Sequence, residues 1–425
     1  MKGRVEKRYE SSWTIIIEMG YDKATKKRNR IVKSVEVDTE DEATDLMIDM
    51  MYEIRHKKYV SPSTMTLSQY LDKWLAFRKT KLAPKTYHSY FSEIERHVKP
   101  AIGNIPLQEV EAIHLQEYYL KMETEGRIKP EDKKGSKKKD ASDEVPRDKK
   151  ELPPGLSQRT INYHHRILSA ALKQAVKWKM IPYNPAQYVD TPTYEKKEMN
   201  FMRKGELAPF LEKIKGHADY AVIYTAVMTG MRQGEVLGLR WYDVDFDHGM
   251  INVRQQLQYV PGKSFFFKSP KSAKSVRAIP MQLPLSKMLK DVKKAQDEYR
   301  RVEEEKLRTK QNGEITEADL KAIYDDQGLV LCQINGKPLD GSKVTNRFKE
   351  LVIEFGRPEL RFHDLRHTFA ALAIAAGIAM EKLQKFMGHE KITTTIDMYG
   401  HIPADTLTEE MKKLSQYLGF ETLAK

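Results

Sequence analysis

The pattern of apolar and polar residues at the start of the chain has the two-residue period of β-strands and then changes to a helical period. Residues 13–18 are rich in β-branched side chains and residues 31–37 alternate, so each run predicts a strand. Thr39, with Glu42 three positions later, predicts a helix start with a capping box. We therefore expect a two- or three-stranded sheet with one helix. The basic turn between the strands favours contact with a DNA groove over a purely structural role.

The following stretch has the period of amphipathic helices. Apolar spacing predicts helices over residues 67–77, 84–97, 109–121 and 156–178. Pro84 suits the first turn of one helix, and Ser157 is a suitable N-cap for another. Residues 125–154 hold many lysines and almost no apolar residue, which predicts a flexible charged insertion. The sequence thus predicts a four-helix unit with one interruption.

From residue 199 onward, helical stretches alternate with short strand-like runs. Helices are predicted over residues 203–213, 219–229, 283–310 and 343–355. Strand-like runs cover 241–246, 250–259 and 330–333, and residues 265–268 and 275–280 are typical of two hairpin arms. Residues 312–326 are polar and predict an exposed excursion. The predicted fold class is α+β and multidomain, ending in a mainly helical domain with a small β-sheet or hairpin.

One predicted helix, over residues 363–376, has two different faces. At 100° per residue, Leu365 and Phe369 fall roughly 180–240° from His363. Arg366 and His367 fall within about 60° of His363 by the same count. One face therefore anchors the helix in a core, while the other presents a guanidinium and two imidazoles. Lysine and glutamate would serve better on a merely solvated face, so this face is a candidate binding site.

Composition narrows the ligand and the compartment. The chain has 425 residues, too many for one typical core, and a formal net charge of +13, which favours a polyanion such as nucleic acid. Cys332 is the single cysteine, so no intrachain disulfide can form. The N-terminus has no apolar signal region, and no run is long enough for a membrane span. We expect a soluble, intracellular protein.

The His/Arg/Tyr cluster in residues 362–401 has two chemical interpretations. His363 and His367 stand four residues apart, as zinc ligands often do, but Arg366 beside them disfavours a cation. Phosphate binding fits better, because arginine forms a two-pronged contact with phosphate oxygens and histidine can move a proton. A tyrosine near the end of the cluster could attack a bound phosphodiester, with no metal or cofactor required.

Four sequence strings carry a family resemblance. TGMRQGEVLGLRW, PKSAKSVRAIP, HDLRHTFA and GHEKITTTIDMYGH occur in that order, and together they closely resemble the tyrosine recombinase (phage-integrase) family. The resemblance implies three domains. These are an arm-type DNA-binding domain of three strands and a helix over 1–57, a helical (SAM-like) core-binding domain over 60–190 and a catalytic domain over 199–425.

The resemblance also assigns roles to residues. The residues that match the family's catalytic positions are Arg232, Lys271, His363, Arg366, His389 and Tyr399. Tyr399 matches the nucleophile that forms a 3′-phosphotyrosyl bond, and Lys271 matches the general acid for the leaving 5′-hydroxyl. The other four match the groups around the phosphate. No cofactor-binding or metal-binding residue is implied.

Nearby residues offer alternatives. Lys274 rivals Lys271, which is favoured because it follows Ser269–Pro270 as the family's lysine does. Glu235 is expected to orient an arginine or cap the local turn. The remaining neighbours, expected to support the site or the fold, are His367, His401 and Arg240.

The implied function is site-specific recombination that integrates or excises a mobile element through a Holliday junction. Implied partners are double-stranded DNA at core and arm attachment sites, three further copies in a tetramer, an excisionase and a DNA-bending host factor. Residues 404–418 predict an amphipathic tail helix that packs on a neighbouring copy or on its own domain. The alternatives are a multimer-resolving recombinase, a type IB topoisomerase-like enzyme, a DNA-binding regulator with an inactive site and, last, a metal-dependent hydrolase.

Overall fold

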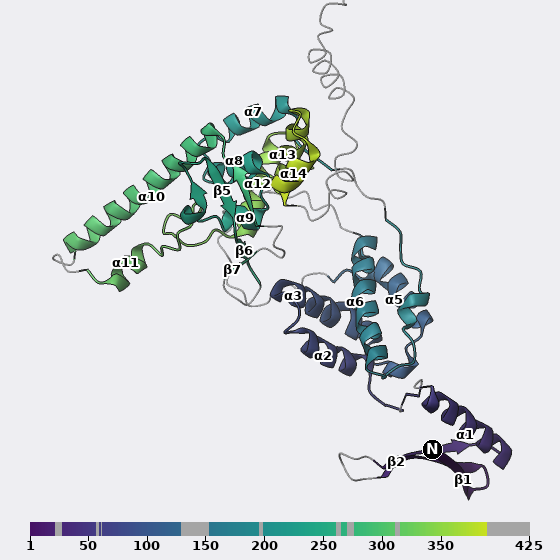
Figure 1. Cartoon of the computed structure of the whole chain (residues 1–425). Coiled ribbons are helices and arrows are strands. Elements are labelled where there is room, and N and C mark those ends of the chain that lie inside the picture. Colours follow the sequence, from purple (N-terminus) through teal and green to yellow (C-terminus); the bar gives the residue numbers. More distant parts are fainter. Residues whose placement is uncertain are drawn as a thin grey trace, which may run out of the picture. The chain divides into compact units, whose positions relative to one another are not determined.

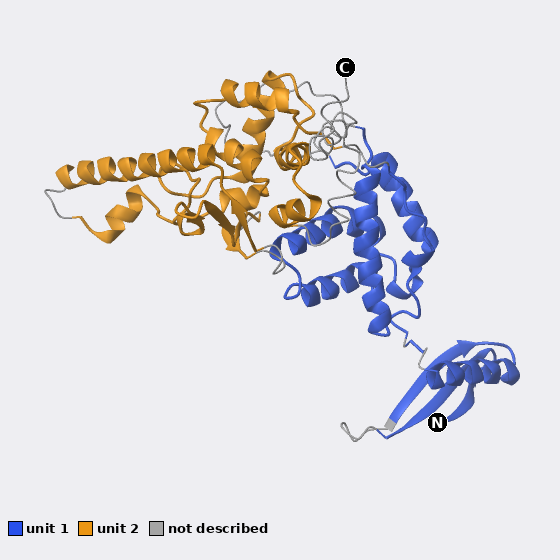
Figure 2. Cartoon of the chain, turned by 45° about the horizontal axis from the view of Figure 1, so that its top comes forward, with its two compact units in different colours: residues 1–195 blue, residues 196–425 orange. Residues whose placement is uncertain are grey.

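The computed structural model divides the chain into two compact units, Met1–Glu195 and Lys196–Lys425 (Figure 2). The structure describes residues 1–21, 28–56, 59–60, 62–128, 153–194, 199–260, 265–269, 276–310 and 315–388. Most of the predicted charged insertion and the whole predicted tail helix lie outside these residues. Among the described residues, no helix is long and apolar enough to cross a membrane.

The chain begins with a three-stranded antiparallel sheet in the order β1-β2-β3 (Figure 1). The strands are β1 (Lys2–Tyr9), β2 (Ser12–Tyr21) and β3 (Arg28–Glu36), and helix α1 (Glu40–Arg55) follows them. Thr39 and Glu42 form the predicted capping box. Ile15 and Ile17 of the central strand are fully buried against Met50 of α1, so one face of the sheet is covered by the helix.

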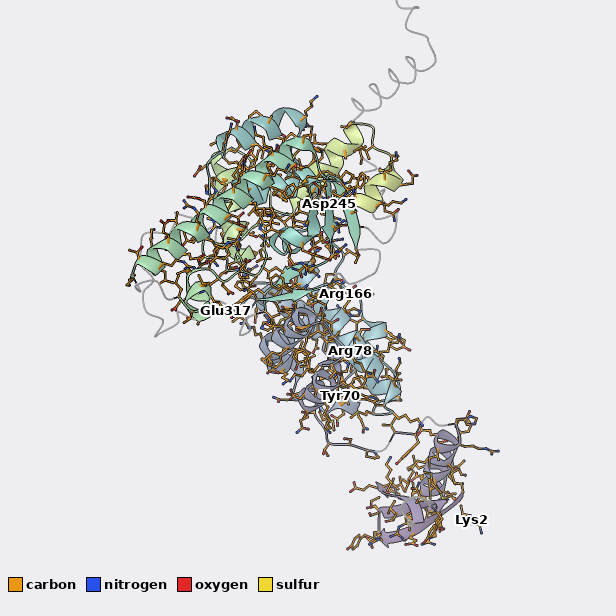
Figure 3. The ribbon with its side chains drawn as sticks, turned by 60° about the vertical axis from the view of Figure 1, so that its left-hand side comes forward. Lys2, Tyr70, Arg78, Arg166, Asp245 and Glu317 are labelled. Atoms are coloured by element: carbon orange, nitrogen blue, oxygen red, sulfur yellow. The ribbon has the colours of Figure 1, made fainter. Side chains whose placement is uncertain are left out.

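A helical bundle with its own core occupies the rest of the first unit. Its elements are α2 (Leu67–Arg78), α3 (Pro84–Glu93), π-helix η1 (Ile94–Val98), α4 (Lys99–Ile102), η2 (Leu107–Glu109), α5 (Ala112–Glu125), α6 (Gln158–Lys177) and η3 (Pro185–Tyr188). Pro84 begins α3 and Ser157 caps α6, as predicted. Tyr70 lies fully buried inside the bundle (Figure 3) and donates a hydrogen bond to the Ala171 carbonyl at 2.6 Å. The contact ties α2 to α6 across the core.

The described part of the second unit combines helices with two small sheets. Its helices are α7 (Lys204–Lys213), α8 (Tyr220–Thr229), α9 (Gln233–Leu237), η4 (Trp241–Asp243), α10 (Leu283–Lys310), α11 (Glu317–Ile323), α12 (Gly341–Glu354), α13 (Asp364–Ala375) and α14 (Met380–Met387). Its strands are β4 (Val244–Asp245), β5 (Met250–Val253), β6 (Gln256–Gln258), β7 (Phe266–Lys268) and β8 (Arg277–Pro280). The α+β prediction is confirmed.

The predicted hairpin of residues 265–268 with 275–280 is wrong in its pairing. β7 pairs with β6, whereas β8 pairs with β5 in the sheet β4-β5-β8. The single strand predicted over 250–259 is divided between these two sheets. β6 packs tightly on the end of α9, where a Cβ on Gly238 would approach the Leu257 backbone nitrogen to 2.7 Å. The polar segment of residues 312–326, which was predicted to be exposed, also contains helix α11.

Helices α8 and α13 pack side by side and position the predicted site (Figure 1). Fully or almost fully buried Ile223, Phe348 and Leu365 belong to the core that surrounds them. A smaller cluster, including Ala370 of α13 and Met387 of α14, joins the last two helices. Packing therefore brings the C-terminal end of α14 toward the start of α13 and the end of α8.

Candidate active site

The structure describes three of the six predicted catalytic residues. Arg232 precedes α9, His363 is the N-cap residue of α13 and Arg366 lies in its first turn. The other three, Lys271, His389 and Tyr399, lie outside the described residues, as do the alternatives Lys274 and His401. The described part of the site is therefore the arginine and histidine group.

Arg232 is held by a sharp turn between α8 and α9. Gly230 ends α8 with a φ of +63°, in the left-handed region that favours glycine. A Cβ at this position would also approach the Phe369 ring to 2.3 Å, so α13 packs directly on the turn. Arg232 then adopts an extended backbone as the N-cap residue of α9. The turn places the Arg232 side chain, 38% exposed, where α8, α9 and α13 meet.

Glu235, which the sequence predicts to orient an arginine or cap the local turn, binds two arginines. Its carboxylate accepts from the backbone N–H of Arg232 at 2.9 Å and from that residue's Nη1 at 2.9 Å. Arg277 of β8 donates from Nη2 to the same carboxylate at 2.8 Å, and both side chains are buried. Burial alone would raise the pKa of Glu235, but Arg277, helped by Arg232, lowers it to about 2. The carboxylate is therefore ionised at neutral pH and fixes Arg232.

Arg366 is almost completely buried between α8 and α14. Its Nη1 donates to the Gly230 carbonyl at 2.5 Å, and its Nη2 donates to the Met387 carbonyl at 2.5 Å. These contacts join the turn that carries Arg232 to the end of α14. The guanidinium thus provides a fixed positive charge inside the junction of the three elements.

His363 and His367 lie next to each other, with ring centroids 5.0 Å apart and planes nearly perpendicular. Burial lowers the pKa of His363, and the Arg366 charge lowers it further. Burial, followed by the neighbouring His363, lowers the pKa of His367 to about 4. Both rings are therefore neutral at pH 7, so each can donate one hydrogen bond and accept another. The assignment of His367 as a supporting residue stays a prediction.

Three arginines bind consecutive backbone carbonyls at the end of α14. Arg277 Nε donates to Phe386 at 2.6 Å, Arg366 Nη2 to Met387 at 2.5 Å and Arg232 Nη2 to Gly388 at 3.5 Å. These carbonyls have few helical partners because the helix ends there, with Gly388 at a φ of +62°. The next residue in the sequence is His389, the predicted fourth phosphate-binding group.

Sequence reasoning missed Arg277. The residue belongs to the string PKSAKSVRAIP, in which the predicted site residue is Lys271, with Lys274 as its alternative. Its position in the strand could have revealed it. In β8, Arg277 shares the buried face with Ile279, where an unpaired charge would be costly. A buried arginine in a short strand predicts a carboxylate partner, and here that partner is Glu235.

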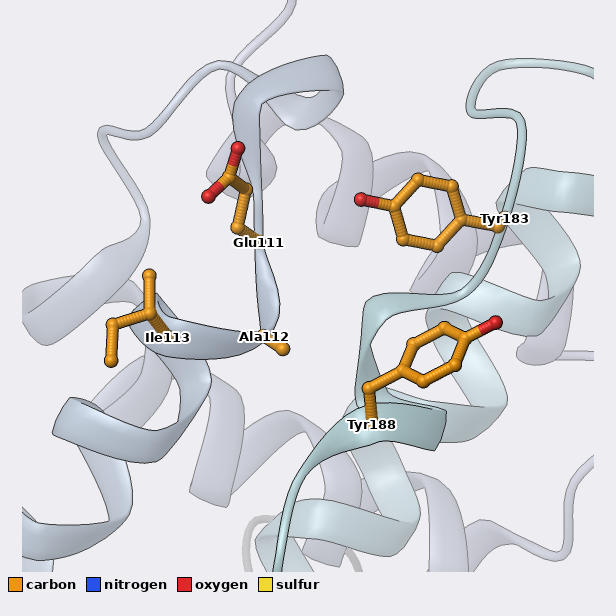
Figure 4. Close-up of a pocket in the computed structure, with 5 residues that line it drawn as sticks. All are labelled: Glu111, Ala112, Ile113, Tyr183 and Tyr188. Carbon is orange, nitrogen blue, oxygen red and sulfur yellow. The ribbon is translucent and has the colours of Figure 1, made fainter.

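Two other features lie away from this group. Arg240 donates from Nε to the buried Asp243 at 2.7 Å, which fits its predicted structural role. The pocket in Figure 4 is lined by Glu111, Ala112, Ile113, Tyr183 and Tyr188 of the helical bundle. It contains none of the predicted catalytic residues.

Two family models match the chain. The model described as Phage integrase family matches residues 200–405, and the one described as Phage integrase, N-terminal SAM-like domain, matches residues 66–122. The first match spans every predicted catalytic residue. The second covers most of the helical bundle before the charged insertion.

Named relatives agree with these matches. A tyrosine recombinase XerC-like protein of Caldanaerobacter subterraneus subsp. tengcongensis is 24% identical over 379 residues, covering 85% of this chain and 86% of the relative. The ICEBs1 integrase of Bacillus subtilis is 27% identical over 269 residues, covering 63% of this chain and 68% of the relative.

Solved structures share the fold. The Tn1549 transposon integrase in complex with transposon right end DNA is 24% identical with a TM-score of 0.59, covering 83% of this chain and all of that one. A lambda integrase tetramer bound to a Holliday junction is 14% identical with a TM-score of 0.51, covering 93% of this chain and 94% of that one.

Proposed function

Because this chain belongs to the phage integrase family of tyrosine recombinases, which break and rejoin DNA, we propose that it integrates and excises a mobile element at specific sites. The observation that carries the proposal is the convergence of Arg232 and Arg366 on the backbone just before His389. A phosphodiester bound beside these groups would meet two guanidiniums and the neutral ring of His363. Such positive and hydrogen-bonding groups stabilise the charge that develops when a phosphate is attacked.

In the proposed reaction, the Tyr399 hydroxyl gives its proton to a neutral acceptor such as His363, its oxygen attacks the scissile phosphorus, and the bond to the 5′-oxygen breaks. Lys271 gives a proton to that oxygen, and Arg232, His363, Arg366 and His389 surround the phosphate. The product is a 3′-phosphotyrosyl ester and a free 5′-hydroxyl. The 5′-hydroxyl of the exchanged strand then attacks this ester, so the number of phosphoester bonds is conserved and no ATP is needed.

The proposed DNA contacts involve all three predicted domains. The net charge of +13 favours phosphate contacts. We assign core-site binding to residues 60–190 and arm-site binding to the sheet and helix of residues 1–57. The Tn1549 integrase was solved with DNA and the lambda integrase as a tetramer on a Holliday junction, which supports a tetramer here. An excisionase, a DNA-bending host factor and a location in the bacterial cytoplasm or nucleoid complete the proposal.

A suicide substrate tests the nucleophile. A core-site duplex with a nick beside the scissile phosphate should trap the wild-type chain as a covalent adduct that survives detergent. The Tyr399→Phe variant should shift the same DNA in a gel but form no adduct. Tyr242, which is 79% exposed, provides the control, because Tyr242→Phe should leave the adduct unchanged. An adduct that persists without the Tyr399 hydroxyl would refute the assignment.

A second substrate separates integration from the alternative reactions. The full chain with arm and core sites on two duplexes should give recombinants, and deletion of residues 1–57 should reduce them while leaving core-site cleavage largely intact. Supercoil relaxation without recombinants would favour the topoisomerase-like alternative. DNA binding without any cleavage would favour the regulator.

A further inference from the structure

A cluster of potential metal ligands lies in the helical bundle, which contains none of the predicted catalytic residues. Glu93 ends α3, His97 belongs to η1 and His164 lies in α6. Each offers one ligand atom, and all three atoms lie within 4.8 Å of one another. The His164 side chain is completely buried, whereas those of His97 and Glu93 are 12% and 27% exposed. The cluster is thus mostly enclosed, with one side toward water.

The backbone gives these side chains a common direction. Glu93 and His97 both face α6, because Glu93 is hydrogen-bonded to His164 and the His97 ring lies beside the His164 ring. The helix changes to a π-helical turn over Ile94–Val98, which is rare and frequently marks functional sites. His164 faces the pair from the second helix, and its ring centroid is 5.2 Å from that of His97. Two helices therefore contribute to the cluster.

Two of the three separations between the ligand atoms are close to those of a tetrahedral metal site. Bonds of about 2.0–2.1 Å to nitrogen and oxygen put neighbouring ligand atoms roughly 3.3 Å apart. Glu93 Oε2 lies 2.9 Å from His164 Nε2 and 3.8 Å from His97 Nε2. One distance is slightly shorter and one slightly longer than this value. The third pair, His97 and His164, has its ligand atoms within 4.8 Å, so side-chain rotation would be needed to bring all three atoms around one ion.

We propose that Glu93, His97 and His164 bind a divalent transition-metal ion, with Zn²⁺ the best match, and that this ion joins α3 to α6. Two imidazole nitrogens and one carboxylate oxygen are typical zinc ligands, and the exposed side of Glu93 leaves room for a water as fourth ligand. The ion would brace the core-binding bundle and take no part in strand cleavage. The proposal does not depend on the proposed function.

Tyr118 supplies the contact that orients the buried ligand. Its hydroxyl lies 2.9 Å from His164 Nδ1, and the residue is 2% exposed. Metal-bound histidines almost always hydrogen-bond through the second ring nitrogen. When Nε2 binds the ion, the ring proton is on Nδ1, and the Tyr118 oxygen accepts it. The ring orientation is therefore set before the ion binds.

An interaction already present between two of the proposed ligands marks the place of the ion. His164 Nε2 and Glu93 Oε2 form a hydrogen bond of 2.9 Å. An ion bound between them would take the place of this hydrogen bond. The charge of Arg96 opposes a cation nearby and moderates the affinity.

His165 gives a matched control. Its Nδ1 lies 3.2 Å from the Tyr119 hydroxyl, so it repeats the Tyr–His pair one residue along on α6. Unlike His164, it is not one of the clustered ligands in the described part of the chain. His165→Gln should therefore remove a half-buried imidazole without removing the proposed site.

The experiment is a Zn²⁺ titration of the full-length chain after chelator treatment, read by calorimetry and by the visible spectrum of Co²⁺ bound in its place. We expect a tight site with a tetrahedral Co²⁺ spectrum in the wild type and in His165→Gln. His97→Gln and Glu93→Gln should each lose it, and Tyr118→Phe should weaken it by about 10–100-fold. Other histidines of the chain contribute equally to all variants.

Two results would overturn the proposal. One is a wild-type chain that binds Zn²⁺ no more tightly than His97→Gln and Glu93→Gln. The other is equal loss of the site in His165→Gln, which would place the bound ion elsewhere. Circular dichroism of each variant checks that the bundle is folded, so that loss of binding reports loss of a ligand.

Discussion

The buried pair of Arg277 and Glu235 allows a quantitative test of how the site is assembled. The change is Arg277→Met, which keeps much of the side-chain length and removes the charge. It leaves Glu235 with Arg232 as its charged partner in the described part of the chain, and it frees the Phe386 carbonyl. The structure therefore predicts loss of stability in the second unit and loss of order at the end of α14.

The size of the effect follows from the burial of the pair. A Glu235 pKa lowered from the ordinary 4.5 to about 2 corresponds to roughly 3 kcal/mol of preference for the ionised form. Removing one partner of a buried ion pair typically costs about 3–5 kcal/mol, because the other charge stays buried. We expect Arg277→Met to lower the free energy of unfolding of this unit by a similar amount. Arg277→Lys should recover part of it, since lysine restores the charge without the planar fork.

Hydrogen exchange in increasing urea, followed by mass spectrometry, measures this change on peptides from α8 and α12. Single-turnover cleavage of a nicked core site, on protein that is still folded, measures the effect on the site. Arg301→Met is the control, because Arg301 forms an exposed ion pair with Glu298 on α10 and should leave both readings unchanged. A loss below about 1 kcal/mol for Arg277→Met would refute the argument that the pair is buried and essential.

Two more perturbations test the turn and the histidines. Gly230→Ala should lower the free energy of unfolding by more than about 1 kcal/mol, because the left-handed backbone and the Phe369 ring both disfavour a Cβ at this position. Gly205→Ala is the control: a Cβ there would meet open space, so the change should be neutral or stabilising in the same urea assay. The lowered pKa values of His363 and His367 predict a stability that falls as pH drops from about 6.5 toward 4, because the unfolded chain takes up these protons first. His367→Gln should flatten that part of the stability curve, and an unchanged slope would contradict the burial of its neutral ring.

Local signals in the sequence predicted the helix starts well. Thr39, Pro84 and Ser157 act through residues within one turn, so their patterns alone were sufficient. The failures involved distant contacts. β7 pairs with β6, which packs against α9, and β8 pairs with β5; no local pattern records these contacts.

In the candidate site, too, the sequence predicted individual residues but not the contacts between distant segments. Family strings predicted Arg232, His363 and Arg366, and the structure describes where these side chains lie. They could not predict that consecutive carbonyls of residues 386–388 would bind three arginines, because those contacts join strands and helices far apart in the sequence. Arg277 was missed for this reason, since its role depends on a carboxylate 42 residues away.

Arg232 binds groups of the protein and can also present N–H groups to a phosphate, and lysine would be a poor substitute because it could not do both. Arg232 bonds to Glu235 through Nη1 and to Gly388 through Nη2, yet its side chain is still 38% exposed. A planar guanidinium can make these protein contacts along one edge and present further N–H groups to a phosphate. A lysine ammonium is a single point charge, so binding to Glu235 would leave it poorly placed for a substrate. The ion pair that fixes Arg232 therefore also orients it, and Arg277 holds the carboxylate in place from the other side.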